Sequence, residues 1–254
     1  MKTQTIERED FAPAGVIELR RYRLQPGTRE TLIKLFDREF IEPQEEAGMR
    51  VIAQFRDLDD PDCFVWLRGF EDMEKRRKAL GTFYAGPVWA RHKHEANGTM
   101  VNSDNVLLLR PASAQATLFP VRKTRPPRTA GGDRTGLVIA TIAYLAPRKE
   151  ADFAGFFRQS VEPLLAETGA TVLAALVPER SENTFPRLPV REGETVFVWL
   201  SIFPDQERYA DHLEALNASR TWIEDIRPEL DRRVSRPNEV SRLVPTARSL
   251  LQWD

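Results

Sequence analysis

The first half of the chain alternates between two hydrophobic patterns. Residues 16–24 (VIELRRYRL) alternate with a period of two, which predicts a β-strand, and a Pro-Gly pair that indicates a turn follows them. Residues 30–47 carry apolar side chains at helical spacing, and a glycine then marks the end of the predicted helix. Two further segments, 49–58 and 63–70, have the composition of strands.

Two further helical segments and a last strand are predicted in this half of the chain. A charge-rich helical segment runs from Asp72 to about Leu80, and a second helical piece runs from Trp89 to about Ala96. Residues 105–110 (NVLLLR) predict a last strand. The order β-α-β-β-α-β is that of the ferredoxin-like unit, a four-stranded antiparallel sheet with both helices on one face.

The second half of the chain repeats the first. Residues 63–70 (CFVWLRGF) match residues 196–203 (VFVWLSIF) at an offset of 133. The same offset carries Trp89 onto Trp222, so two separate segments agree. A repeat of this length indicates two copies of one structural unit.

The offset between the copies is smaller upstream. Glu42-Pro43 falls on Glu162-Pro163 at an offset of 120, and we align Tyr22 with Tyr144 at an offset of 122. The second copy must therefore contain an insertion. The Pro-rich, polar residues 178–194 have the composition of a loop and are the expected place for it.

These patterns divide the chain into five parts. We expect an N-terminal tail (1–14), a first ferredoxin-like unit (15–112), a linker (113–134), a second ferredoxin-like unit (135–247) and a C-terminal tail (248–254). One unit leaves a face of its sheet bare, and a second unit can cover that face. We therefore predict an α+β fold class, with tandem ferredoxin-like units packed through their sheets as an intramolecular α/β barrel. A monomer is sufficient for such a barrel, and further homo-oligomers are compatible with it.

The first unit resembles a known family. The features that carry the resemblance are the V-I-E-L-R-x-Y-x-L-x-P-G opening (16–27), Pro43 and Gly48 at the end of the first helix, the F-V-W-L-R-G-F strand (64–70) and G-P-V-W (86–89). Together they are similar to the NIPSNAP family of the dimeric α/β-barrel superfamily. The resemblance implies the β-α-β-β-α-β fold and the paired barrel. It implies little chemistry, because barrels of this kind include cofactor-free monooxygenases, muconolactone isomerase and haem-binding proteins.

Composition excludes several classes of function. The net charge is −1, with 37 basic and 38 acidic residues interleaved, so we expect no nucleic-acid partner. No apolar run approaches the roughly 18 residues of a membrane span, and we expect no membrane insertion. The N-terminal residues lack the pattern of a signal peptide, which favours a cytoplasmic location. Cys63 lies in a strand-like segment and is predicted to be a buried, inert thiol. No metal or cofactor motif is present, so we expect neither group.

A candidate catalytic set lies on the first strand. Glu18, Arg20 and Tyr22 are two apart and therefore share one face of the sheet. At the offset of 122 their counterparts are Ala140, Ile142 and Tyr144. The first copy is polar where the second is apolar. We interpret Arg20 as the residue that holds an anionic group of the substrate, Glu18 as a base and Tyr22 as a hydrogen-bond donor. The alternative is a salt bridge that stabilises the paired sheets.

A second set of residues is predicted to bind a ligand. Its members are Arg68, Trp66, Trp89, His92 and His94. The arginine and the two histidines are replaced by Ser201, Asp225 and Arg227 in the second copy. Histidines two apart on a helix point about 200° apart, so they cannot share a metal. The alternatives are a solvated helix face for the histidines and a core position for the tryptophans.

Three functions follow as hypotheses. The first is a cofactor-independent enzyme that binds a small hydrophobic or aromatic anionic substrate in the first unit. The second is a non-catalytic ligand-binding or scaffolding protein that interacts with other proteins. The third, haem binding, would give a Soret absorption band.

Overall fold

The computed structural model describes residues 14–113, 124–131 and 135–253. The first unit contains β1 (Val16–Leu24), α1 (Arg29–Leu35), η1 (Phe36–Phe40), α2 (Ile41–Glu46), β2 (Arg50–Asp57), β3 (Cys63–Phe70), α3 (Met73–Ala85), α4 (Pro87–Gly98) and β4 (Met100–Pro111). The second unit contains β5 (Leu137–Leu145), α5 (Glu150–Phe156), η2 (Phe157–Val161), α6 (Glu162–Glu167), β6 (Thr171–Pro178), β7 (Val196–Phe203), α7 (Gln206–Ala218), η3 (Trp222–Ile226), α8 (Arg227–Arg233) and β8 (Val234–Pro245). The predicted β-α-β-β-α-β order is confirmed in both units.

Hydrophobic periodicity located most of these elements to within a few residues. The helix predicted over 30–47 is α1, the π-helical segment η1 and α2 in direct succession. The charge-rich helix continues past its predicted end to Ala85, and β4 begins at Met100, earlier than predicted. The first residues of β4 are exposed or half-buried, so they lack the apolar pattern that marks the rest of the strand.

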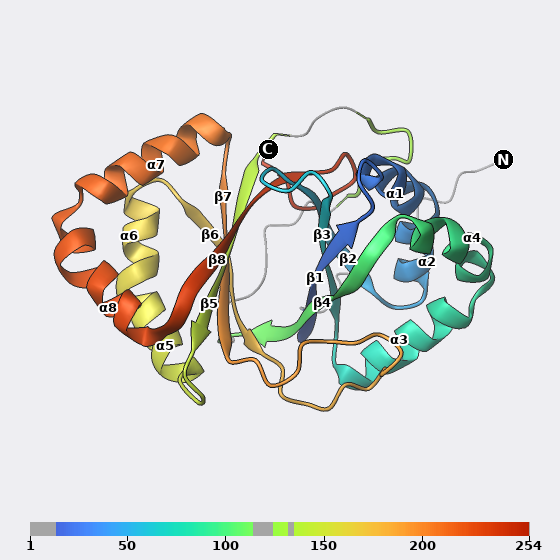
Figure 1. The fold of residues 1–254 in the computed structure, drawn as a ribbon, viewed down its shortest axis with the longest axis horizontal. Coiled ribbons are helices and arrows are strands. Elements are labelled where there is room, and N and C mark those ends of the chain that lie inside the picture. Colours follow the sequence, from blue (N-terminus) through green and yellow to red (C-terminus); the bar gives the residue numbers. More distant parts are fainter. Residues whose placement is uncertain (1–13, 114–123, 132–134, 254) are drawn as a thin grey trace.

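The strands close into one barrel. Within the described residues its order is β1-β3-β2-β8-β5-β7-β6-β4, and β4 returns to β1. The two units meet where β2 pairs with β8 and where β4 pairs with β6 (Figure 1). The helices of each unit cover the outer side of its own strands, so two helical layers lie at opposite ends of the molecule. The predicted intramolecular barrel is confirmed.

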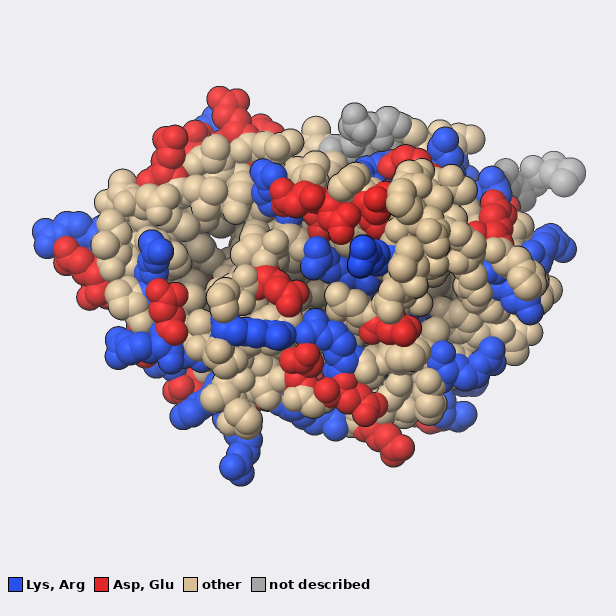
Figure 2. Space-filling model, in the orientation of Figure 1, with Lys and Arg blue, Asp and Glu red and all other residues tan. Residues whose placement is uncertain are grey.

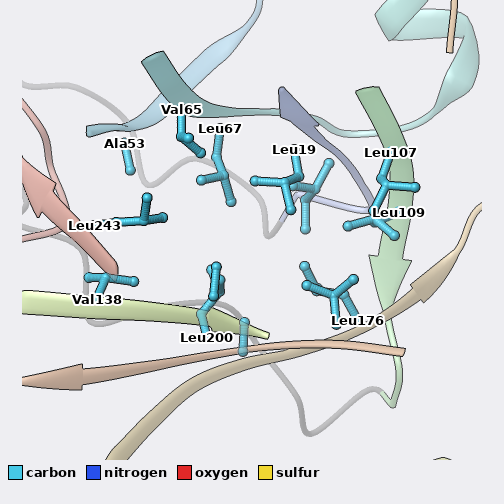
Figure 3. Packing of buried hydrophobic residues seen from close by; sticks show 14 of the residues in the cluster. Leu19, Ala53, Val65, Leu67, Leu107, Leu109, Val138, Leu176, Leu200 and Leu243 are labelled. Atoms are coloured by element: carbon cyan, nitrogen blue, oxygen red, sulfur yellow. The ribbon is translucent and has the colours of Figure 1, made fainter. Parts of the chain in front are cut away.

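The barrel interior is a hydrophobic core. Side chains such as Leu19, Leu67, Leu109, Val138 and Leu200 point toward one another from both units (Figure 3). Because successive side chains of a strand point to opposite faces, the intervening residues face the helices. Each unit therefore has a second core between its strands and its helices. The candidate site lies in this outer layer of the first unit.

The strand pairing corrects the predicted alignment of the two copies. Val16 pairs with Phe70, and Leu137 pairs with Phe203. Phe70 and Phe203 are equivalent at the offset of 133, so Val16 is equivalent to Leu137 at an offset of 121, not 122. The alignment of Tyr22 with a tyrosine in the second unit was therefore wrong.

A shift of one residue moves every side chain of a strand to the other face. The structural counterparts of Glu18, Arg20 and Tyr22 are Ile139, Thr141 and Ala143. Tyr144 instead joins the barrel core. The contrast between a polar first copy and an apolar second copy remains, because two of the three correct counterparts are apolar.

The segments outside the two units are partly described. The predicted N-terminal tail falls outside the described residues except for Ala14, and the predicted linker is described only at 113 and 124–131. Arg125 donates hydrogen bonds to the Glu45 carboxylate and to the backbone of β2. The end of the chain is also packed: Leu250 N donates to Ile52 O at 3.2 Å. The predicted C-terminal tail thus covers the first unit.

The surface carries both charge signs. Figure 2 shows Lys and Arg side chains interspersed with Asp and Glu across the face in view. Among the described residues, no helix is both long enough and apolar enough to cross a membrane.

Candidate functional site

Strand pairing brings the predicted residues of β1 and β3 together. Glu18 lies opposite Arg68, and Arg20 lies opposite Trp66. All four side chains face the helices and are almost completely buried. Arg68, which was predicted to bind a ligand, therefore lies beside the polar residues of β1.

Glu18 is the centre of a buried ion cluster. Its Oε2 accepts hydrogen bonds from Arg20 Nη1 at 2.6 Å and from Arg68 Nε at 2.7 Å. Its Oε1 accepts a third from Arg76 Nε on α3, also at 2.7 Å. The three arginines and Glu18 are each at most 1% exposed. One carboxylate therefore holds three guanidinium groups in the protein interior.

The ionisation of Glu18 follows from its partners. Burial would raise the pKa of its carboxyl, but the charges of Arg68, Arg20 and Arg76 hold that pKa far below its usual range. A carboxylate enclosed in this way is a weak proton acceptor. The geometry therefore disfavours the role of base predicted for Glu18 and makes it a positioning residue.

The cluster has more positive than negative charge. Arginine stays protonated in proteins, so three cations face one anion. Within the described part of the chain, Nη2 of Arg68 and Nη2 of Arg76 are buried without a hydrogen-bond partner. Buried charge that lacks a partner is unfavourable. The cluster therefore presents a net positive potential to its surroundings.

Tyr22 connects the cluster to a cavity. Its hydroxyl oxygen accepts a hydrogen bond from Arg20 Nε at 2.9 Å. No described group accepts the hydroxyl proton in turn. Burial raises the pKa of this hydroxyl, and Arg20 opposes that rise, so the group stays protonated near neutral pH. Tyr22 is therefore free to donate a hydrogen bond.

The cavity lies between the first sheet and its helices. It has a volume of about 240 Å³, more than the roughly 150 Å³ that accommodates benzene in an engineered cavity. Its lining is formed by Tyr22, Leu32, Phe36, Phe40, Gln44, Trp66, Phe83, Tyr84, Trp89, Asn97, Met100, Ser103, Phe185, Arg187 and Leu188. Most of these side chains are aromatic or aliphatic, and the few polar groups among them are typical of a site that orients a small ligand.

Three lining residues contact the arginine cluster directly. Tyr22 accepts from Arg20, as described, and Gln44 Oε1 accepts from Arg68 Nη1 at 3.2 Å. The Arg68 guanidinium carbon lies 5.1 Å from the ring centroid of Trp66. The Trp66 indole Nε1 is itself buried without a described partner. An N–H without a partner in a cavity wall is a ready donor to a ligand.

Two parts of the site were not predicted from the sequence. Arg76 lies in a charge-rich segment that resembles a solvated helix, yet it shares a stripe with Ala79, Leu80 and Phe83. That i, i+3, i+4, i+7 spacing was the signal for its burial. The second part is Phe185, Arg187 and Leu188, which reach the cavity from the other unit.

Comparison with known proteins identifies the first unit. The NIPSNAP family model matches residues 17–115, which run from the second residue of β1 past the end of β4 and include all the residues of the ion cluster. Residues 17–115 are a NIPSNAP domain. Among curated proteins, none matches this sequence.

Solved structures share the fold of the whole chain. A candidate monooxygenase from Fusobacterium nucleatum has a TM-score of 0.59 at 10% identity, and the match covers 96% of this chain and 99% of that one. A second candidate monooxygenase, from Lactobacillus acidophilus, has a TM-score of 0.55 at 13% identity and 95% and 100% coverage. An anthrone oxidase-like protein has a TM-score of 0.53 at 13% identity and 94% and 96% coverage. At these identities the similarity shows the fold alone, and it does so over both units of the chain.

The remaining predicted residues of the NIPSNAP domain differ in their positions. Trp89 lines the cavity, whereas His92 and His94 on α4 do not. The His92 ring lies between Glu39 and Glu95, with nitrogen-to-oxygen distances of 3.7 and 3.6 Å. His94 is exposed. No group of three potential metal ligands occurs among the described residues.

Cys63 lies outside the cavity of the NIPSNAP domain. It is buried in the barrel core, and burial raises the pKa of its thiol to about 11. A thiol with so high a pKa is not a nucleophile near neutral pH.

The second unit has a cavity of a different kind. Its volume is about 490 Å³, and small residues such as Ala151, Ala154 and Gly155 form part of its lining. None of its lining side chains has a buried, unpartnered polar atom in the described structure. The NIPSNAP domain is therefore the better candidate for a site that orients a ligand.

Proposed function

We propose that the NIPSNAP domain is a cofactor-independent enzyme unit that binds a small aromatic substrate with an acidic hydroxyl group and stabilises its anion. One observation carries the proposal: three buried arginines share a single carboxylate directly behind the wall of an aromatic cavity. An excess of buried positive charge favours a negative charge nearby.

The groups in the cavity wall have complementary roles in this proposal. The aromatic side chains bind the ring of the substrate. Tyr22 and the Trp66 indole donate hydrogen bonds to its oxygen, and the arginines polarise the Tyr22 hydroxyl through Arg20. The substrate O–H bond breaks, its electron pair stays on the oxygen, and the proton leaves to water. Arg20 then acts through Tyr22 and does not touch the substrate.

The ionised ring is the reactive form. An aromatic anion donates electrons to an electrophile more readily than its neutral parent does. Because two proteins of the same fold carry the name of candidate monooxygenases, dioxygen is the first co-substrate to test. An oxygen electrode measures its uptake when the protein and a phenol are mixed.

Binding is tested with three probes of nearly equal shape: 4-chlorophenol, 4-chlorotoluene and 4-chlorobenzylamine. Titration calorimetry should show the tightest binding for the phenol and none for the ammonium compound, since the site repels a cation. Trp66→Phe removes the indole N–H together with part of the ring system. It should weaken phenol binding about tenfold more than it weakens binding of 4-chlorotoluene, which has no hydroxyl and reports the loss of packing alone. Equal binding of all three probes, or no binding of any, would overturn the proposed ligand class. Phenol binding without a reaction would overturn the enzymatic part alone.

A further inference from the structure

The connection between β6 and β7 belongs structurally to the other unit. It spans 179–195, whereas the equivalent connection of the first unit spans only 58–62. Glu179 N donates to Leu108 O at 2.9 Å, and Arg191 N donates to Val106 O at 2.8 Å. Both ends of the loop are thus hydrogen-bonded to β4. Figure 1 shows the loop extending from the second unit toward α3.

The centre of this loop is fixed by side chains. Asn183 Oδ1 accepts hydrogen bonds from Arg76 Nη1 at 3.0 Å and from Phe185 N at 3.1 Å. Thr184 Oγ1 donates to Met73 O at 3.1 Å. The Phe185 ring stacks on Tyr84, with 5.9 Å between the centroids. The loop is therefore an anchored cover over the cavity.

One cation of the cover lacks a partner. Arg187 lines the cavity and is exposed, so it lies at the mouth. In the described structure it makes no hydrogen bond and no ion pair. The other two arginines of the loop are paired, Arg180 with Glu150 and Arg191 with Glu194. Arg187 is thus available to an anionic group of a ligand.

We propose that Arg187 binds a carboxylate at the outer end of the ligand, so that the substrate class is a hydroxyaromatic carboxylic acid. This inference rests on the proposed function, in which Tyr22 and Trp66 bind the hydroxyl oxygen at the inner end of the ligand. A guanidinium group suits the outer end, because it donates two parallel hydrogen bonds to a carboxylate. The second unit then determines which ligand the first unit accepts.

The test uses ring-matched pairs of acid and amide: 4-hydroxybenzoate with 4-hydroxybenzamide, and 6-hydroxy-2-naphthoate with 6-hydroxy-2-naphthamide. Their dissociation constants are measured by titration calorimetry at two ionic strengths. In the wild-type protein at least one acid should bind about tenfold more tightly than its amide, and added salt should reduce that preference. Arg187→Gln should abolish the preference and leave amide binding unchanged. Arg208→Gln makes the same change on an exposed part of α7 and should preserve it.

The outcomes separate this inference from the proposed function. Equal preference for the acid in the wild type and in Arg187→Gln overturns the role of Arg187. Tighter binding of the amides than of the acids in the wild type overturns the ligand class. Failure of every acid and every amide to bind overturns the proposed function as well, because both forms carry the phenolic hydroxyl.

Discussion

Arg76 of the first unit donates a hydrogen bond to Asn183 of the second unit, with 3.0 Å between Nη1 and Oδ1. The same guanidinium group contacts Glu18 through Nε, so the cover loop and the ion cluster share one side chain. The two copies are therefore not equivalent. One holds the charged cluster and the aromatic cavity, and the other supplies part of the cavity wall.

Removal of the Asn183 amide should loosen the cover loop. Asn183→Ala leaves the Leu188 carbonyl without its donor and leaves Arg76 Nη1 only the longer contact to Thr184 Oγ1, 3.4 Å away, which costs about 1–3 kcal/mol of unfolding free energy. Hydrogen exchange should accelerate at the amides of 179–195. Asn217→Ala, on an exposed position of α7, is the matched control and should change neither quantity. Unchanged exchange in the loop would contradict its anchoring by Asn183.

Glu18→Gln should be strongly destabilising. It leaves three buried arginines without a counter-ion, and we expect a loss of about 3–5 kcal/mol in urea unfolding at pH 7. The folded-state pKa of Glu18 is depressed, so its contribution is present above the unfolded-state pKa and is lost as the pH falls through the folded-state value. The effect should therefore shrink only in acid below about pH 4.5. Glu74→Gln breaks an exposed pair and should change stability by less than about 0.5 kcal/mol. A comparable effect from the two variants would argue against the cluster.

Tyr22→Phe separates ligand binding from folding. The variant keeps the ring but removes the hydroxyl that accepts from Arg20. We expect about tenfold weaker binding of 4-chlorophenol and a loss of only about 1–2 kcal/mol in stability. Binding of 4-chlorotoluene should not change. Tyr209→Phe in the second unit should leave phenol affinity as it is, since Tyr209 does not line the cavity. If Tyr22→Phe bound phenol with wild-type affinity, the Tyr22 hydroxyl would not be a ligand-binding group.

Asp37 should destabilise the protein at neutral pH. Burial raises the pKa of its carboxyl to about 6, although Arg248 opposes the shift. A carboxyl with a raised folded-state pKa favours folding below its unfolded-state pKa, near 4, and loses that contribution as the pH rises through about 6. Asp37→Asn should therefore gain about 2 kcal/mol at pH 7.5 and nothing near pH 4. Urea unfolding at both pH values measures the difference, with the exposed Asp225→Asn as control. A gain of the same size at both pH values would show that the carboxyl does not titrate as described.

The sequence predicted the fold well because its signals are local and repeated. The alternation of 16–24 and the strand-like composition of 63–70 define strands that the structure reproduces residue for residue. The alignment of the first strands failed where it relied on a single matching tyrosine. Two strand sequences can be aligned one residue out of register without an obvious mismatch. In the barrel, however, a shift of one residue exchanges the two faces of the strand.

The candidate site was only half predictable. Period two placed Glu18, Arg20 and Tyr22 on one face, and the comparison between copies added Arg68. Composition correctly indicated a loop within 178–194, but its position over the other unit depends on the closure of the barrel. That closure pairs β4 with β6 and brings the loop to the cavity of the NIPSNAP domain. Neither propensity nor spacing carries such long-range information.

Stabilisation of an aromatic anion is the central claim, and 4-nitrophenol tests it most directly because its ionised form absorbs visible light. A pH titration of the probe, bound to saturating protein, gives its pKa in the cavity. We predict a bound pKa at least one unit below that of the free probe, which corresponds to about 1.4 kcal/mol in favour of the anion. Tyr22→Phe and Trp66→Phe should each reduce the shift. A bound pKa equal to or above the free value would contradict the claim.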